Sequence, residues 1–168
     1  MDIDHFRYRE TDERFLTLHD CRADQAMIND GVLSFVFPDG IFIAPDHPDN
    51  PTGKMVRTGL ARVDFPLLRG AQHIGNVWEE WEDVSVYVFR KLWFGLSIRQ
   101  EWSLVRLLYW LNTRKGELEF ISRYEGYMDR IYECCLWQDK RPYHRDCQLL
   151  ITTKQPAFRW NDWGQEEE

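Results

Sequence analysis

Alternating apolar and polar positions run through much of the chain and predict short β-strands. Residues 32 to 37 place Leu33, Phe35 and Phe37 on one face, between two tight-turn motifs. Asn29-Asp30-Gly31 precedes this segment and Pro38-Asp39-Gly40 follows it, and each turn ends in a glycine that accepts a positive φ. We therefore expect an N-terminal meander in which residues 41 to 44 return as the partner strand of residues 32 to 37.

Further strands are predicted at residues 60 to 68, 84 to 89 and 148 to 153. Residues 84 to 89 are apolar on both faces, which is typical of a central strand that is covered on both sides. Residues 117 to 137 fit two patterns: a pair of strands that turns at Gly126, or a helical stripe that includes Leu118, Ile121 and Met128. We favour the two strands, because Phe, Ile, Tyr and Trp prefer a pleated surface.

One helix is predicted to begin near Glu101. Ser103 is a candidate N-cap and Gly116 a candidate stop. The apolar positions recur at the spacing of a single helix face, and they are Leu104, Leu107, Leu108 and Leu111. The predicted fold class is mostly β (α+β): an antiparallel β-sandwich or open barrel of about seven to nine short strands, with one amphipathic helix packed on it.

The length of 168 residues corresponds to a single domain. Residues 1 to 14 are highly charged and predict a solvated lead-in. Residues 15 to 158 form the expected β-rich domain, with a proline-rich loop at 45 to 54 and a polar surface excursion at 69 to 83. Residues 159 to 168 contain two tryptophans and several acids, and we expect them to form a loosely held acidic tail.

The acidic balance changes the range of expected partners. Asp and Glu number 28 against 21 Lys and Arg, for a formal net charge of −7, which argues against binding to nucleic acid. No apolar stretch approaches the ~20 residues of a membrane span. The first five residues lack the basic and apolar regions of a secretory signal, so we expect a cytoplasmic protein with no membrane partner.

Cysteine usage and common motifs indicate neither a metal nor a cofactor. The four cysteines (Cys21, Cys134, Cys135 and Cys147) include no CxxC pair, and we expect free thiols without a zinc site. Phosphate-loop, dinucleotide-binding, zinc-protease and serine-hydrolase motifs do not occur in the chain. Paired carboxylates for glycoside hydrolysis stay open, because their separation depends on the fold.

Three local groups could carry chemistry, but each has a plainer structural explanation. His19 and Cys21 would share one face of a strand, as a thiolate and its base require, although turn-capping polar residues explain them equally. The loop from Asp46 to Asn50 is rich in oxygen ligands, but Pro48 and Pro51 break the register of a calcium loop. His5 with Asp2 and Asp4 lies at a chain end that is seldom preorganised.

The candidate partner-binding site is the segment Trp78-Glu79-Glu80-Trp81-Glu82-Asp83. It places two tryptophans three residues apart among clustered acids. An exposed Trp is costly unless a partner covers it, and grouped carboxylates attract a basic partner and speed its docking. If both tryptophans instead point into the core, the acids form an ordinary solvated edge.

These observations favour a non-catalytic binding domain that recognises another macromolecule. Aromatic residues and Arg, of which there are 16 against five Lys, are enriched at recognition surfaces. A compact, acidic, β-rich single domain resembles, in general style only, the bacterial immunity proteins that neutralise toxins, so a basic toxin is one concrete partner. The alternative is a small-ligand-binding protein or enzyme with an aromatic-lined β pocket. A purely structural role through an edge strand is a third class.

Overall fold

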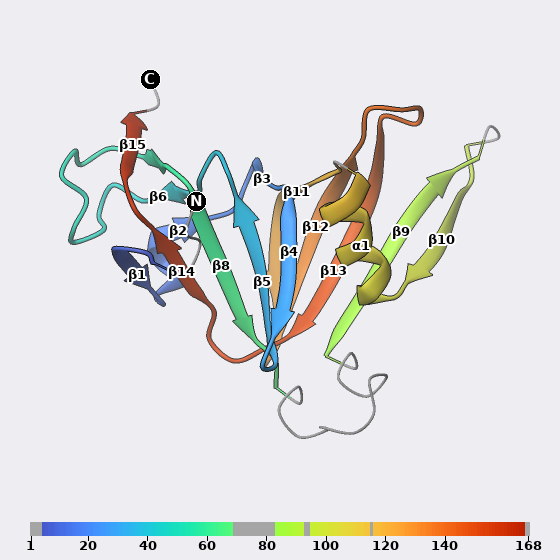
Figure 1. Ribbon diagram of the computed structural model, residues 1–168, viewed down its shortest axis with the longest axis horizontal. Coiled ribbons are helices and arrows are strands. Elements are labelled where there is room, and N and C mark those ends of the chain that lie inside the picture. The colour runs from blue at the N-terminus through green and yellow to red at the C-terminus, as the bar shows by residue number, and fades with distance from the viewer. Residues whose placement is uncertain (1–4, 69–82, 93–94, 115, 167–168) are drawn as a thin grey trace.

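The computed structural model describes residues 5–68, 83–92, 95–114 and 116–166 (Figure 1). The chain is 56% strand and 9% helical, and its strands form three antiparallel sheets. The predicted class, mostly β with one α-helix, is therefore confirmed. The strands outnumber the prediction, because several consist of only two to four residues. Among the residues described, no helix is long and apolar enough to cross a membrane.

The five-stranded sheet lies in front of the larger sheet in Figure 1. Its spatial order is β1 (Tyr8–Glu10), β14 (Ala157–Trp160), β8 (Ala61–Pro66), β5 (Val32–Phe37) and β4 (Gln25–Asn29). β4 and β5 form the hairpin predicted at Asn29-Asp30-Gly31, where Asp30 and Gly31 both have positive φ.

The six-stranded sheet forms the second layer and carries the surfaces discussed below. Its spatial order is β10 (Ser97–Trp102), β9 (Val84–Lys91), β13 (His144–Thr152), β12 (Asp129–Trp137), β11 (Glu117–Glu125) and β3 (Cys21–Ala23). β11 and β12 settle the ambiguity of residues 117 to 137 in favour of two strands.

A small four-stranded sheet completes the fold at one end. It runs β15 (Trp163–Glu166), β7 (Val56–Thr58), β6 (Phe42–Ile43) and β2 (Leu16–Thr17), and the short 3-10 helix η1 (Glu13–Phe15) leads into β2. The turn at Gly40 exists, but the expected pairing of the strands on either side is wrong. β6 pairs with β2 and β7, whereas β5 pairs with β4 and β8.

The α-helix α1 (Leu104–Arg114) packs on the face of the six-stranded sheet that carries the core. Ser103 Oγ accepts a hydrogen bond from the backbone N–H of Arg106 at 3.2 Å, which confirms the predicted N-cap. Asn112 binds the open edge of β4 in the manner of a strand: its side chain accepts from Ala26 N and donates to Ala26 O. The helix therefore ties the two large sheets together.

The core between the large sheets is a network of aromatic rings in edge-to-face or tilted contact. Phe120 of β11 lies 5.5 Å from both Phe35 and Phe37 of β5, measured between ring centroids, and 5.2 Å from Tyr132 of β12. All four rings are buried. Such pairs add to the free energy of burial, and here they connect the five-stranded sheet to the six-stranded one.

The described residues near both chain ends belong to the sheets, which the sequence did not predict. Trp160, expected in a loose tail, is 1% exposed and stacks on Tyr8 with ring centroids 5.5 Å apart. β14 lies between β1 and β8, and β15 pairs with β7, so residues 159 to 166 are part of the sheets and not a tail. The lead-in likewise contains β1 and part of η1. Pairing between distant segments, invisible to local composition, causes both differences.

Candidate functional site

The predicted segment 78 to 83 is represented in the structure by its last residue only. Trp78, Glu79, Glu80, Trp81 and Glu82 lie outside the described residues. Asp83 is 2% exposed, and its backbone carbonyl accepts a hydrogen bond from Thr152 N at 2.7 Å at the start of β9. Asp83 is therefore a buried residue and not part of an exposed acidic edge.

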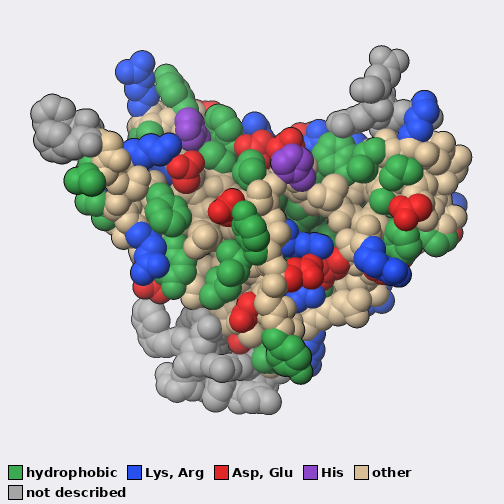
Figure 2. All heavy atoms as spheres, turned by 180° about the vertical axis from the view of Figure 1, so that it is seen from behind, with side chains coloured by type: hydrophobic (Ala, Val, Ile, Leu, Met, Phe, Trp, Pro, Cys, Tyr) green, Lys and Arg blue, Asp and Glu red, His purple; other side chains and the backbone are tan. Residues whose placement is uncertain are grey.

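The six-stranded sheet has a second face that no described element covers, here called the outer face (Figure 2). Along β9, Val84, Val86 and Val88 point into the core, while Tyr87 and Phe89 alternate with them and stay half-exposed. The prediction of a strand covered on both sides is therefore wrong for the described structure. The half-exposed apolar side chains of the outer face are Tyr87, Phe89, Ile121, Ile131, Cys135, Trp137 and Leu150.

On this face, the indole ring of Trp137 is fixed by contacts with three side chains. Its indole Nε1 donates to Glu119 Oε2 at 2.6 Å. The Arg22 guanidinium lies 4.7 Å from the indole centroid and also pairs with Glu119, and the ring of His144 lies 5.3 Å away on another side. A rigid, partly exposed aromatic ring loses little conformational entropy on binding, as anchors of protein interfaces require.

The outer face is shallow and carries both acidic and basic side chains around Trp137. A depression of about 590 Å³ is lined by Glu119, Glu133, Asp146 and His144 together with the apolar residues. Asp146 pairs with Lys91 at 3.3 Å. Glu133 is exposed between Ile131 and Cys135. The face thus combines an aromatic anchor with carboxylates, and the site predicted at segment 78 to 83 stays a prediction.

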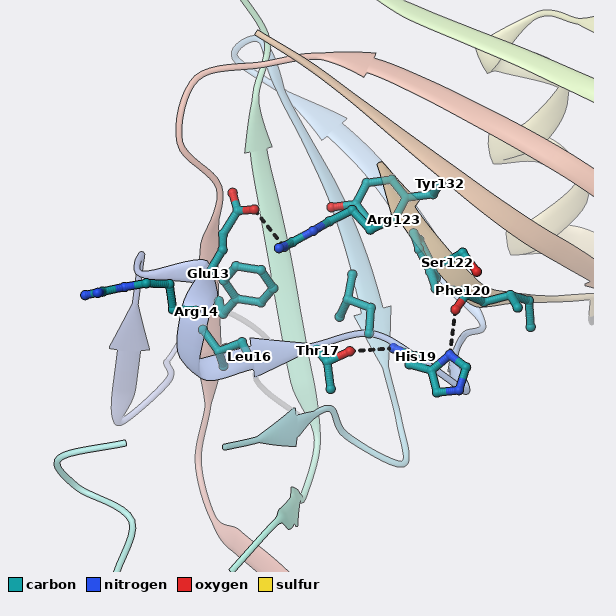
Figure 3. Close-up of a pocket in the computed structure, with 12 residues that line it drawn as sticks. Glu13, Arg14, Leu16, Thr17, His19, Phe120, Ser122, Arg123 and Tyr132 are labelled. Atoms are coloured by element: carbon teal, nitrogen blue, oxygen red, sulfur yellow. Dashed lines mark hydrogen bonds and ion pairs between the residues drawn. The ribbon is translucent and has the colours of Figure 1, made fainter. Parts of the chain in front are cut away.

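A smaller and deeper cavity of about 320 Å³, here called the bulge pocket, lies between η1–β2 and β11 (Figure 3). A β-bulge between Phe120 and Ser122 inserts Ile121 as an extra residue into β11. The ring nitrogen Nδ1 of His19 donates to the Ile121 carbonyl, which the bulge frees from the ladder. The shift in register also turns Arg123 to the same side as Tyr132, its cross-strand partner.

The floor of the bulge pocket is an ion cluster around Glu13. Glu13 accepts from Arg123 Nη1 at 2.7 Å and from Arg130 Nε at 2.9 Å, and its side chain is 11% exposed. Figure 3 shows Tyr132 and Arg123 extending side by side toward Glu13. The Tyr132 hydroxyl is buried and has no hydrogen-bond partner among the described residues. Burial, reinforced by the charge of Glu13, raises the pKa of Tyr132, so this hydroxyl stays protonated.

Two other candidate groups are structural in the observed geometry, and the third, His5 with Asp2 and Asp4, has both of its aspartates outside the described residues. Cys21 is fully buried and its thiol faces the carbonyls of Thr17 and His19, whereas the exposed His19 ring donates to the Ile121 carbonyl. His47 points inward, where its Nδ1 accepts from Asp49 N and its ring contacts Trp160 and Trp163. Within the described part of the chain, no group of three His, Cys, Asp or Glu residues could hold a metal ion.

Comparisons with protein-family models, with curated proteins and with solved structures find no match to this chain. Sequence reasoning overlooked both the outer face and the bulge pocket. The outer face could have been found, because the apolar residues on both sides of residues 84 to 89 indicated a second buried surface. The bulge pocket could not, since a bulge and a contact between residues 13 and 123 leave no local pattern.

Proposed function

We propose that this chain is a non-catalytic binding domain that recognises another protein through the outer face of its six-stranded sheet. One observation carries the proposal: β9 has the sequence of a strand buried on both sides, yet the described structure covers only one. An antiparallel sheet that faces water normally alternates polar and apolar positions. A partner that covers Tyr87, Phe89 and Trp137 would supply the missing layer.

Charge selects the kind of partner. Glu119 and Asp146 already pair with Arg22 and Lys91, whereas Glu133 is exposed in the depression beside Trp137. A complementary surface would therefore place Lys or Arg opposite Glu133 and apolar groups at its centre. Such charges act mainly on the association rate, whereas the aromatic anchor acts on dissociation. A basic toxin that the chain neutralises, in the manner of an immunity protein, is one partner of this kind.

The test places a photo-crosslinking amino acid, p-benzoylphenylalanine, at position 87 of the outer face or at position 109 of α1. Tyr109 is 59% exposed and provides the control on the opposite side of the sheet. We expect cells that produce the protein to yield a crosslinked heterologous protein from position 87 and none from position 109. The crosslinked protein is then identified and purified, and its affinity for the unmodified chain is measured.

Affinity measurements with that purified protein decide whether the exposed aromatic side chains of the outer face contribute to binding. Phe89→Ala should raise the Kd by about tenfold or more, since truncated aromatic anchors cost upwards of ~1.4 kcal/mol. Val105→Ala, at an exposed position on α1, should leave it unchanged. Crosslinks only between copies of this chain, equal crosslinking from both positions, or an unchanged Kd for Phe89→Ala would each contradict the proposal.

A second candidate function, small-ligand binding, is favoured by the unpartnered hydroxyl of Tyr132. A buried polar group without a partner is rare, and the bulge pocket that it lines lies at the lower end of the ~300–1,000 Å³ of ligand sites. A thermal-shift screen over sugars, nucleotides and amino acids tests this function. A compound that stabilises the wild type but not Tyr132→Phe would support it, and a flat screen would set it aside.

A further inference from the structure

The six-stranded sheet divides at one end into two ribbons. β9 and β13 pair from Val84↔Ile151 to Val88↔Cys147, and their ladder ends there. Beyond this point the last residues of β9 pair only with β10, and the first residues of β13 pair only with β12. Figure 1 shows the two ribbons diverging toward their tips. A groove of about 740 Å³, here called the fork groove, opens between them.

Three arginines from three different elements line the fork groove: Arg90 of β9, Arg106 of α1 and Arg145 of β13. Alternate side chains of a strand point to the same face. Arg90 therefore lies on the same face as Val86 and Val88, which is the face that carries α1. Arg145 lies on that face too, together with Cys147 and Leu149. Gln100 of β10, directly opposite Val88, lines the groove from the same face. The guanidinium of Arg106 lies 4.2 Å from the centroid of the Trp102 ring. The arginines thus reach the groove from the face that carries α1. From the other side it is lined by outer-face residues, among them Lys91 and Asp146, which pair with each other at 3.3 Å.

These three arginines have no carboxylate within 4.0 Å among the residues that the structure describes. Elsewhere in the protein, Arg22, Arg123, Arg130 and Arg159 all form ion pairs. The Nε of Arg145 is in addition buried without a hydrogen-bond partner. Like charges that share a groove repel one another, and a buried charged donor without an acceptor costs free energy. A bound anion would remove both costs.

We propose that the fork groove binds a small molecule that carries two or more phosphoryl groups. A carboxylate is planar and is satisfied by one guanidinium fork, whereas a tetrahedral phosphate accepts donors from several directions. Arginines on a strand, on a second strand and on a helix approach the groove from such different directions. The groove volume lies within the ~300–1,000 Å³ that is common for ligand sites. The fork groove adjoins the outer face, with which it shares Phe89, His144 and Asp146, but its arginines do not belong to the outer-face depression. Neither proposal depends on the other.

The experiment titrates the full chain with sodium tripolyphosphate in an isothermal calorimeter at low ionic strength. We expect saturable binding to the wild type, and about tenfold or more weaker binding for Arg90→Gln and for Arg145→Gln. Arg145→Lys keeps the charge but not the planar fork, and should restore only part of the affinity. Arg99→Gln is the matched control, because Arg99 lies over Tyr87 on the outer face. It should bind as the wild type does, and thermal unfolding verifies that each variant is folded.

Four results would overturn the proposal. The first is no binding heat at about 1 mM tripolyphosphate, which corresponds to less than ~4 kcal/mol of affinity. The second is an equal loss in Arg99→Gln, because the effect would then reflect net charge alone. The third is equally tight binding of citrate, which would assign the groove to carboxylates. The fourth is tighter binding of a single-stranded oligonucleotide with the same arginine dependence, which would assign the phosphates to nucleic acid.

Discussion

Replacing Glu13 by Gln tests the ion cluster under the bulge pocket. Glu13 accepts one charged hydrogen bond from Arg123 at 2.7 Å and another from Arg130 at 2.9 Å, with only 11% of its side chain exposed. Hydrogen bonds to charged groups contribute ~1.5–3 kcal/mol each. The Gln side chain keeps one oxygen that can accept from one of the two arginines, but its amide N–H group would face the guanidinium of the other. Because Arg123 is itself 33% exposed, water recovers part of the loss, and we expect Glu13→Gln to cost about 2–3 kcal/mol of unfolding free energy.

The same arginine provides the control. Arg123 also pairs with Glu125 at 2.9 Å, but the Glu125 side chain is 51% exposed, and such surface pairs contribute ~0–1 kcal/mol. Urea unfolding at neutral pH should therefore separate Glu13→Gln from Glu125→Gln by about 1.5 kcal/mol or more. Added salt should reduce the small effect of Glu125→Gln and leave that of Glu13→Gln nearly unchanged. Equal losses for the two variants would refute the view that burial of Glu13 determines the difference.

Three further predictions concern single sites. Gly40 has a φ of +81°, and a Cβ there would collide with the Thr58 carbonyl oxygen, so Gly40→Ala should lower the unfolding free energy by more than ~2 kcal/mol in urea titration. Burial raises the pKa of Cys134, and that of Cys147 to about 12, so a thiol reagent should modify only the half-buried Cys135 in the native protein and all four cysteines in denaturant. Burial of Glu10 opposes its ionisation, but the backbone N–H groups of Asp12 and Thr11 outweigh burial and hold its pKa below the usual value. The lowered pKa stabilises the folded state above the pKa that Glu10 has in the unfolded chain, and this stabilisation is lost as the pH falls through the pKa of Glu10 in the folded protein. Between about pH 5 and 3, thermal melts should therefore show a smaller loss of stability for Glu10→Gln than for the wild type.

Local signals in the sequence account for the elements that were predicted correctly. The helix follows from leucines at helical spacing and from Ser103, whose hydroxyl forms the expected cap. The hairpin at Asn29-Asp30-Gly31 follows from residues that accept positive φ. Each of these features is decided within about ten residues, a range over which intrinsic preferences and turn chemistry dominate.

Features decided by distant contacts could not be predicted. A turn at Gly40 indicates a change of direction but not which sheet the next strand joins. Trp160 looked like part of an acidic tail because its partners, Tyr8 and β8, are far away in sequence. His47 is buried in a proline-rich loop for the same reason, since Phe15, Trp160 and Trp163 surround it. The fork groove depends on where a ladder ends, which no residue pattern marks.

The position of β14 between β1 and β8 has a consequence for the order of folding. Among the described strands, β1 pairs with β14 alone, in a register that joins Tyr8 to Trp160 across most of the chain. Closing such a long loop costs conformational entropy before any contact repays it, so pairings of this kind form late and slowly. β4, β5 and β8 can assemble from residues 25 to 66 alone, but residues 8 to 10 must wait for residues 157 to 160. Until then, the edge of β8 that β14 later occupies remains open to pairing with another chain.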